Sequence, residues 1–550
     1  MATHATHFYH SKTMNQHLEL FPPLAEIPAE FQIEALHQRH YLVNGEMREW
    51  TGDSHEVFSP IIDQSGDTPQ RKSIGSYPIT GEAQALEALS SAEIAYANGR
   101  GDWPNMSVSE RIVCVENFVG KMLEQKELVV KLLMWEIGKS LADSNKEFDR
   151  TVEYIYDTID ALKNIDRNSS RFTIEGGIIG QIRRSPLGIV LCMGPFNYPL
   201  NETYTTLIPA LLMGNVILFK PPKFGTLLHY PMLEAFRTCF PKGVVNTIYG
   251  RGHAVVPALM RSGKIDSLTL IGSSRVADQL KKLHPKSNRL RAVLGLDAKN
   301  AGIVLKSADI DLAVKECLLG SLSFNGQRCT ALKILFVHRS IVQKFIAKFS
   351  QEADKLKVGM PWEKGVQITP LPEPGKPAYL SEIVEDAKKH GAKIMNEKGG
   401  QVFESLVMPT VLFPVNDQMK IYREEQFGPV VPIVPFDDPE EPIQYVIESD
   451  HGQQVSIFGE DSNQVANLLD VMVNQVSRVN LNAQCQRGPD SFPFTGRKDS
   501  AEGVLSVTNA LHSFSIRTVV ATKDNKSNKK LVNEIITEHK SHFLSTKYVF

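Results

Sequence analysis

The chain has 550 residues, of which 42% are hydrophobic and 22% charged, and its formal net charge is -2. A chain of this length exceeds the size at which one hydrophobic core keeps growing, so we expect two or three domains. The composition is ordinary for a globular protein, and the near-zero net charge provides no general attraction to nucleic acid or to a membrane surface. Binding partners therefore have to be inferred from particular sites.

The six cysteines are too few for a disulfide framework, and none forms a C-x-x-C pair, so we expect a cytoplasmic protein. Residues 1–12 lack the apolar core of a signal peptide and the Arg-rich pattern of a transit peptide. His4, His7 and His10 recur there at a spacing of three, and we expect a polar tail and no metal site. The most apolar window, 207–219, is shorter than the roughly 20 residues of a membrane span.

The first half of the chain begins with a weakly patterned leader over 1–40, followed by short strands expected within 41–62. Ser107 and Glu110 form a capping-box pattern, and apolar residues then recur at helical spacing, which predicts a long amphipathic helix. Further helices are predicted over 126–138 and 144–162. The Gly-containing segment 176–184 is typical of a β-hairpin arm.

The middle of the chain alternates strand-like runs with helix-length segments, which predicts a doubly wound parallel sheet able to bind a dinucleotide. The runs lie at 188–193, 215–220, 244–249, 267–272 and 301–306. A second alternation, with strands at 334–337 and 430–434 and a helix at 341–356, predicts a second α/β domain. A charged run then leads into an amphipathic tail at 531–550.

Cys329 is the candidate nucleophile. It ends the small polar turn Phe-Asn-Gly-Gln-Arg-Cys at 324–329. A thiolate is nucleophilic, and the neighbouring Arg328 or exposed backbone N–H groups would increase its population at neutral pH. A single cysteine is more often an inert buried residue. The motif as a whole, however, resembles the catalytic-cysteine motif of the aldehyde dehydrogenase superfamily.

Other motifs of that superfamily occur in the same order, and the resemblance covers approximately Tyr41 to Ala521. Gly-Pro-Phe-Asn-Tyr-Pro at 194–199 resembles the segment whose asparagine amide, here Asn197, forms the oxyanion hole with the backbone N–H of the cysteine. Taken alone, a buried structural asparagine would be the commoner interpretation.

The resemblance implies the aldehyde dehydrogenase fold, which is an α/β fold with a Rossmann-like cofactor domain, an α/β catalytic domain and a β oligomerisation arm. We therefore expect a leader over 1–40, an NADP-binding domain over 41–325 with an oligomerisation hairpin at about 167–187, and a catalytic domain over 326–503. An oligomerisation strand over 504–522 and a C-terminal tail over 523–550 complete the chain. The resemblance also implies a homo-oligomer, either a dimer or a tetramer.

The cofactor residues follow from the same resemblance. Lys220, at the end of a predicted strand, matches the lysine that reaches the adenosine ribose. Lys223 stands where many NAD-preferring relatives have an acidic residue, and a lysine would attract the 2′-phosphate of NADP. NADP is therefore the expected cofactor, and a surface lysine without this role is the alternative.

Two further motifs match family segments that contact the other parts of the cofactor, which are the pyrophosphate and the nicotinamide riboside. Gly272 and Ser273 match the turn at a helix N-terminus that faces the pyrophosphate. In the motif Glu-x-Phe-Gly-Pro, Glu425 would hold the nicotinamide ribose and Phe427 would pack beside the ring.

The substrate class is suggested by Cys-Gln-Arg-Gly-Pro-Asp at 485–490 and Phe-Pro-Phe at 492–494. These segments resemble the non-phosphorylating glyceraldehyde-3-phosphate dehydrogenases within the superfamily. The resemblance implies that four side chains hold the phosphate and hydroxyl groups of the substrate, namely Arg150, Tyr198, Arg328 and Arg487. Guanidinium groups suit a phosphate because they offer paired donors and stay charged, although a single arginine is more often part of a surface ion pair.

One motif departs from the family. Gly295 stands where the superfamily has the glutamate that activates water to hydrolyse the thioester, and glycine cannot accept a proton. Another carboxylate such as Asp297 could act as the base, coenzyme A could accept the acyl group, or the protein could be a non-catalytic member of the fold. We expect hydrolysis first and acylation second, so that glyceraldehyde 3-phosphate is oxidised to 3-phosphoglycerate without inorganic phosphate.

Overall fold

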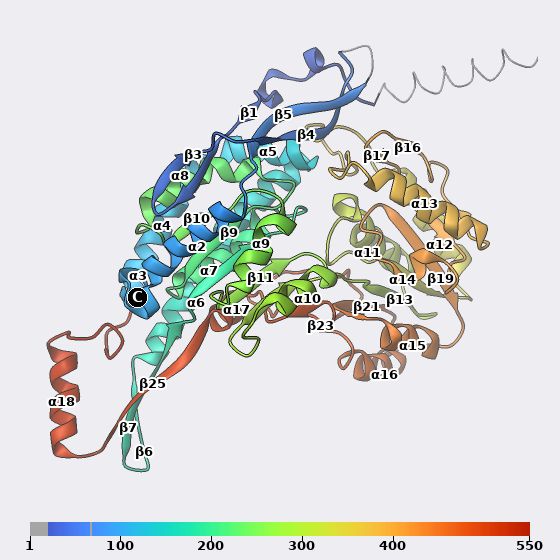
Figure 1. The fold of residues 1–550 in the computed structure, drawn as a ribbon. Coiled ribbons are helices and arrows are strands. Elements are labelled where there is room, and N and C mark those ends of the chain that lie inside the picture. The colour runs from blue at the N-terminus through green and yellow to red at the C-terminus, as the bar shows by residue number, and fades with distance from the viewer. Residues whose placement is uncertain (1–19, 66–68) are drawn as a thin grey trace, which may run out of the picture.

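The computed structural model describes residues 20–65 and 69–550, and two sheets of mainly parallel strands lie next to each other in it (Figure 1). The first sheet has the order β10-β9-β8-β11-β12-β24, in which only β24 is antiparallel to its neighbour. β8 consists of five buried residues, as expected of a strand with both faces covered. The strands are β8 (Ile189–Met193), β9 (Val216–Lys220), β10 (Val245–Thr247), β11 (Ser267–Ile271), β12 (Arg291–Gly295) and β24 (Ala501–Glu502). The predicted doubly wound sheet is confirmed.

Helices surround this first sheet on both sides (Figure 1). They are α2 (Glu82–Tyr96), α7 (Asn201–Leu212), α8 (Tyr230–Cys239), α9 (Gly252–Arg261) and α10 (Ser274–Leu283). Asn215, the buried residue just before β9, joins three separate parts of the chain. Its side chain accepts from the N–H groups of Leu187 and Gly188 and donates to the carbonyls of Ala210 and Phe514.

The second sheet has seven strands in the order β15-β18-β19-β14-β13-β21-β22, with only β15 antiparallel. The strands predicted at 334–337 and 430–434 are confirmed as β14 and β19, and the helix predicted at 341–356 is α12. The strands are β13 (Ala301–Val304), β14 (Ile334–His338), β15 (Lys393–Ile394), β18 (Thr410–Phe413), β19 (Val430–Phe436), β21 (Gln454–Phe458) and β22 (Arg478–Leu481). Its helices are α11 (Ile310–Leu322), α12 (Val342–Asp354), α13 (Lys376–Lys389), α14 (Lys420–Arg423), α15 (Glu440–Glu448) and α16 (Ser462–Met472).

The expectation that the strand at 301–306 belongs to the cofactor sheet is wrong. β13 pairs with β14 on one side and β21 on the other, inside the seven-stranded sheet. The reason is that a short apolar strand has the same pattern in either sheet, so alternation along the chain does not show where one sheet ends. We therefore propose that the two domains divide at 296–300, ahead of the boundary expected at 325.

Three consecutive helices precede the first sheet. The predicted capping box is confirmed, because the Glu110 N–H donates to the Ser107 hydroxyl and the Ser107 N–H donates to the Glu110 carboxylate. The helices are α4 (Val108–Glu124), α5 (Lys126–Ile137) and α6 (Leu141–Ser169), and α6 extends beyond the predicted 144–162 at both ends.

A narrow three-stranded arm projects from the first domain (Figure 1). It consists of the predicted hairpin, β6 (Phe172–Glu175) and β7 (Ile178–Pro186), together with β25 (Ser515–Lys523), which pairs antiparallel with β7. The closing strand expected over 504–522 is shorter than predicted, because α17 (Val507–Ser513) takes up its first part. Beyond the arm, α18 (Lys526–Thr537) lies outermost, and Ser545 returns to bond with Gln181 of β7.

The remaining elements complete the fold. They are η1 (Leu24–Glu26), η2 (Ala29–Phe31), β1 (Leu36–His37), β2 (His40–Val43), β3 (Glu46–Glu49), β4 (Ser54–Asp63), β5 (Gln70–Pro78), η3 (Ala97–Gly99), α3 (Asp102–Asn105), η4 (Leu227–His229), η5 (Ser323–Gly326), β16 (Val402–Phe403), β17 (Leu406–Val407), β20 (His451–Gly452) and β23 (Arg497–Lys498). His4, His7 and His10 lie outside the described residues. None of the helices within 20–65 and 69–550 combines the length and apolar character that crossing a membrane requires.

Candidate active site

Cys329 follows a strained turn at the C-terminus of α11. Phe324, Asn325 and Gly326 adopt φ values of 49°, 56° and 68°, and a non-glycine residue in this left-handed region costs on the order of 1 kcal/mol or more. The turn is supported by Thr369, whose N–H and hydroxyl bond to the Asn325 side chain at 2.9 and 3.2 Å. The surroundings therefore fix the backbone that presents Cys329, which keeps part of its surface exposed.

Asn197 is brought to the cysteine turn from the other domain. It lies in the loop after β8, and its Nδ2 donates to the carbonyl of Gln327, two residues before Cys329, at 2.9 Å. A side-chain amide has two N–H donors, so the second one remains for an oxyanion. The predicted partnership of Asn197 with the cysteine segment thus has a direct physical contact.

Lys333 joins the cysteine to the predicted nicotinamide residues. Its Nζ donates to the Cys329 carbonyl at 3.0 Å and forms an ion pair with Glu425 at 2.7 Å. Phe427, two residues beyond Glu425, packs edge-on against Phe196 with ring centroids 5.9 Å apart. Sequence reasoning missed Lys333. A lysine directly before an apolar strand, four residues after the cysteine, was a usable signal for a site residue.

Lys220 and Lys223 both line a cavity of about 380 Å³. Arg251, His55 and His253 also line it, so several basic side chains face one cavity. Burial lowers the pKa of Lys220 to about 8. The donor set suits an anionic group such as the 2′-phosphate of NADP. Arg251 and His253 were missed, although they directly follow the strand predicted at 244–249.

Gly272 and Ser273 lie at the start of α10, as predicted, and the Gly272 N–H donates to the Gly295 carbonyl at 2.9 Å. The first N–H of α10 already has an acceptor. The Asp297 carboxylate accepts from the Ser274 N–H at 2.8 Å and from its hydroxyl at 2.9 Å. Asp297 therefore caps a helix, which argues against its use as a base for water.

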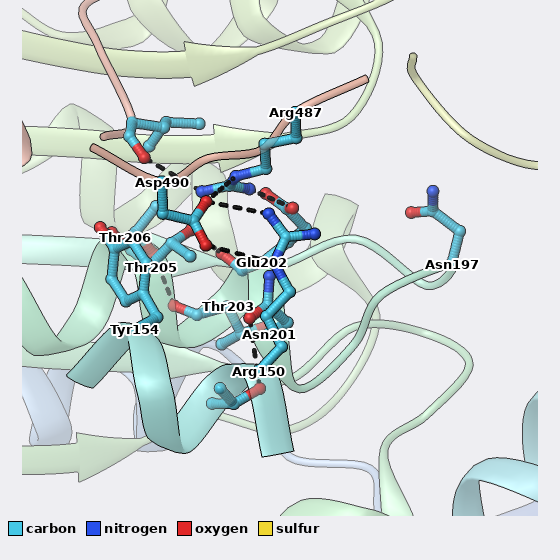
Figure 2. A network of polar contacts seen from close by, with 12 residues as sticks. Arg150, Tyr154, Asn197, Asn201, Glu202, Thr203, Thr205, Thr206, Arg487 and Asp490 are labelled. Carbon is cyan, nitrogen blue, oxygen red and sulfur yellow. Dashed lines mark hydrogen bonds and ion pairs between the residues drawn. The ribbon is translucent and has the colours of Figure 1, made fainter. Parts of the chain in front are cut away.

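Arg150, whose side chain is 30% exposed, and the buried Arg487 are brought together in one network of ion pairs (Figure 2). Asp490 bridges them, because its carboxylate accepts from Arg150 at 2.9 and 3.2 Å and from Arg487 Nε at 3.2 Å. Glu202, in the first turn of α7, forms a second ion pair with Arg487. Asn197 lies to one side of this cluster (Figure 2). Sequence reasoning missed the roles of Glu202 and Asp490.

Tyr198 and Arg328 are the other two predicted substrate residues. The Tyr198 ring packs edge-on against Phe324 at 5.7 Å and lies 3.7 Å from the Lys139 ammonium. Arg328 points toward the end of α11, where its Nη2 donates to the carbonyls of Leu319 and Gly320. Arg328 is therefore not part of the arginine network.

Gly295, the departure from the family motif, ends β12. Its φ is not left-handed, and a Cβ built there would meet Ile271 and Leu505 side chains at 3.5 Å, an ordinary contact distance. Neither the backbone nor tight packing requires glycine at this position. The absence of a carboxylate at position 295 is therefore a departure from the family motif in its chemistry and is not imposed by the fold.

Four charges influence the Cys329 thiol. Burial raises its pKa and the Glu202 carboxylate raises it further, whereas Lys333 and Arg487 lower it and Glu425 raises it. The surroundings of Cys329 therefore suppress the ionisation of its thiol. Removal of the Glu202 charge would favour the thiolate.

We predict that Glu202→Gln shifts the pH midpoint of Cys329 alkylation by iodoacetamide to lower pH than in the wild type. The physical reason is that the thiolate no longer faces the Glu202 negative charge. Mass spectrometry of the peptide that contains Cys329 measures the rate at each pH. Glu385→Gln, on the exposed surface of α13, is the matched control. A midpoint that stays in place or rises in Glu202→Gln would contradict this electrostatic account.

Comparison with known proteins agrees with the geometry. Residues 59–520 match the family model of the aldehyde dehydrogenase family. The NADP-dependent glyceraldehyde-3-phosphate dehydrogenase of Streptococcus equinus is 31% identical over 455 residues, which are 80% of this chain and 93% of that protein. The protein of the same name from Pisum sativum is 28% identical over 86% of this chain and 93% of its own length.

Solved structures give the same result. The NADP-dependent glyceraldehyde-3-phosphate dehydrogenase of Bacillus halodurans, complexed with NADP, superposes with a TM-score of 0.80 at 30% identity, covering 90% of this chain and all of that one. The glyceraldehyde-3-phosphate dehydrogenase of Methanocaldococcus jannaschii, also complexed with NADP, gives a TM-score of 0.76 at 27% identity, with 86% of this chain and all of that one covered. The predicted fold is confirmed, and the chain belongs to the aldehyde dehydrogenase family.

Proposed function

We propose that this chain is an NADP-dependent aldehyde dehydrogenase that oxidises glyceraldehyde 3-phosphate to 3-phosphoglycerate through a Cys329 thioester, without inorganic phosphate. The observation that carries the proposal is the hydrogen bond from Asn197 to the Gln327 carbonyl, because it holds an amide donor beside the cysteine turn. The names of the relatives from Streptococcus equinus and Pisum sativum support both the cofactor and the substrate.

The first step is addition of the Cys329 thiolate to the aldehyde carbon. The free N–H of the Asn197 amide and the backbone N–H of Cys329 would donate to the oxygen that becomes negative. Bound NADP supplies the hydride acceptor, and loss of hydride from the same carbon leaves a thioester on Cys329. Addition of water then releases the carboxylic acid and restores the thiol.

The cofactor would lie between the basic cavity and the cysteine. Lys220 and Lys223 would hold the ribose and the 2′-phosphate, with Arg251 beside them. Gly272 and Ser273 would face the pyrophosphate, Glu425 would hold the nicotinamide ribose and Phe427 would pack beside the ring. The ion pair between Lys333 and Glu425 fixes that carboxylate near the cysteine.

The substrate phosphate would be held by Arg150 and Arg487, with Tyr198 beside them. Arg328 keeps its predicted role as a proposal. Its Nη2 donates to the carbonyls of Leu319 and Gly320, whereas its buried Nε has no hydrogen-bond partner among the described residues. An enzyme of this kind would act in the cytoplasm in glycolytic metabolism, as a homo-oligomer, dimer or tetramer, assembled through the β6, β7 and β25 arm.

Two reactions compete for the last step, in which the acyl group leaves Cys329. Gly295 offers no base and Asp297 caps α10, so neither activates water in the usual way. A thiol acceptor such as coenzyme A needs less help from a base, which keeps the acylating reaction as the second candidate. The first candidate is hydrolysis. It is favoured because the paired arginines match a phosphorylated aldehyde, as in the hydrolytic subfamily that the sequence resembles.

We predict that Cys329→Ala abolishes NADPH formation from glyceraldehyde 3-phosphate and NADP, because no other group in the site can form the thioester. The increase in NADPH absorbance measures the rate. Cys239→Ala, which removes a partly exposed thiol elsewhere, should keep the wild-type rate and serves as the control. Retained turnover in Cys329→Ala would rule out the covalent route.

Lys223→Glu is predicted to lower the ratio of kcat/KM for NADP over NAD by about tenfold or more, because a charge-assisted hydrogen bond contributes about 1.5–3 kcal/mol. Initial rates with each cofactor give the ratio. The control is Lys344→Glu, an exposed lysine of α12, which should leave the ratio unchanged. An unchanged ratio in Lys223→Glu would remove Lys223 from the cofactor site.

A further inference from the structure

Glu202 is a buried carboxylate for which neither the motifs nor the reaction steps provide a role. It lies in the first turn of α7, five residues after Asn197, and its side chain is 10% exposed. Its carboxylate contacts Arg487 Nη1, and the Arg487 side chain is 6% exposed. Figure 2 shows Glu202 and Asp490 converging on Arg487. An isolated buried carboxylate would be costly, so this contact accounts for the position of Glu202.

Protein oxygen atoms lie beside all three nitrogens of the Arg487 guanidinium, but Nη1 forms no hydrogen bond within the described part of the chain. Nη1 contacts Glu202, Nε donates to Asp490 at 3.2 Å, and Nη2 donates to the Leu505 carbonyl at 3.0 Å. The guanidinium carbon also lies 4.8 Å from the centroid of the Phe494 ring. The N–H donors of Nη1 therefore face the Glu202 carboxylate without a hydrogen bond to it, and a ligand phosphate that approached Nη1 would meet that carboxylate.

The charges of the network cancel. Arg150 and Arg487 contribute two positive charges, and Glu202 and Asp490 contribute two negative charges. A site that binds a phosphate dianion is expected to have an excess of positive charge. Here that excess would appear only when one carboxylate is displaced or loses its charge.

The two carboxylates are not equivalent. Asp490 contacts both arginines and so holds them together. Burial acts to raise its pKa, but Arg487 and Arg150 together lower it below the ordinary value. Glu202 has an ion pair with Arg487 alone among the side chains of the described residues. Displacing Glu202 would leave the pair of arginines and their bridge intact with a net positive charge. Displacing Asp490 would separate the two arginines.

We propose that Glu202 is a specificity-determining residue that occupies Nη1 of Arg487 in place of the substrate phosphate, so that a phosphorylated aldehyde binds this nitrogen by displacing Glu202. This inference rests on the proposed function, in which Arg487 binds the phosphate. Glu202 thus sets how strongly the site prefers a dianionic aldehyde over an uncharged hydroxyaldehyde of the same length. The competing interpretation is that Glu202 positions Arg487 for phosphate binding, and it predicts the opposite effect of removing the charge.

The test uses Glu202→Gln and Glu202→Ala, which both remove the charge, so that either suffices if the other does not fold. Glu202→Asp keeps the charge and is the conservative control. Asp166→Asn is the matched control for loss of a buried carboxylate paired with an arginine, since Asp166 pairs with Arg183. It lies about 24 Å from Arg150 along α6.

Two readouts are compared on the full chain. Calorimetric titration with inorganic phosphate gives a Kd that does not depend on turnover. Steady-state rates give the ratio of kcat/KM for glyceraldehyde 3-phosphate over glyceraldehyde. We expect Glu202→Gln to lower the Kd for phosphate about tenfold and to raise the kcat/KM ratio through KM, because a negative charge no longer competes for Arg487. Glu202→Asp and Asp166→Asn should resemble the wild type.

The outcomes separate this inference from the proposed function. An unchanged or higher Kd for phosphate in Glu202→Gln would overturn the inference, even where the wild type oxidises glyceraldehyde 3-phosphate. A lower Kd without oxidation of glyceraldehyde 3-phosphate by any variant would support the role of Glu202 and reject the proposed substrate.

Discussion

The hydrogen bond from Asn197 to the Gln327 carbonyl is the contact on which the rest of the site depends, because it joins the two domains at the cysteine. On one side lies the loop after β8, and on the other lies the strained turn that presents Cys329. Lys139 supports the loop from a third element. Its buried ammonium donates to the Asn197 carbonyl at 2.7 Å and pairs with Glu147. Glu147 in turn accepts from the N–H groups of Leu200 and Asn201 at the start of α7.

The buried lysines around this contact, which are Lys139, Lys299 and Lys333, all have hydrogen-bond partners that offset the cost of burying their charges. Lys299 is buried and its Nζ donates to the carbonyls of Ile421 and Glu424 and to the side chain of Gln426. Burial lowers its pKa, and the neighbouring Lys333 lowers it further. These bonds hold the segment 421–426, which contains Glu425, beside Lys299 at the approach to β13. Fixing polar groups before substrate arrives is the general requirement for stabilising developing charge.

Much of this arrangement could be predicted from the sequence, for physical reasons that differ between residues. Short local motifs were enough to identify four site residues, which are Cys329, Asn197, Glu425 and Phe427. The capping box at Ser107 could be predicted because it depends only on nearby residues. The sheet that contains β13 depends on long-range pairing, so chain order alone placed that strand in the wrong sheet. Glu202 lies in a helical turn, where a lone glutamate is usually solvated, and only the tertiary contact with Arg487 reveals its position. The orientation of Arg328 likewise depends on the end of α11.

In the proposed reaction, Cys329 forms a thioester that is then hydrolysed although position 295 carries no base. The NADPH progress curve with glyceraldehyde 3-phosphate and NADP, recorded without inorganic phosphate or coenzyme A, tests it most directly. We expect sustained turnover, with water as the acyl acceptor. A burst of about one equivalent per site followed by arrest would contradict it, because the acyl group would then remain on the enzyme until another acceptor arrives.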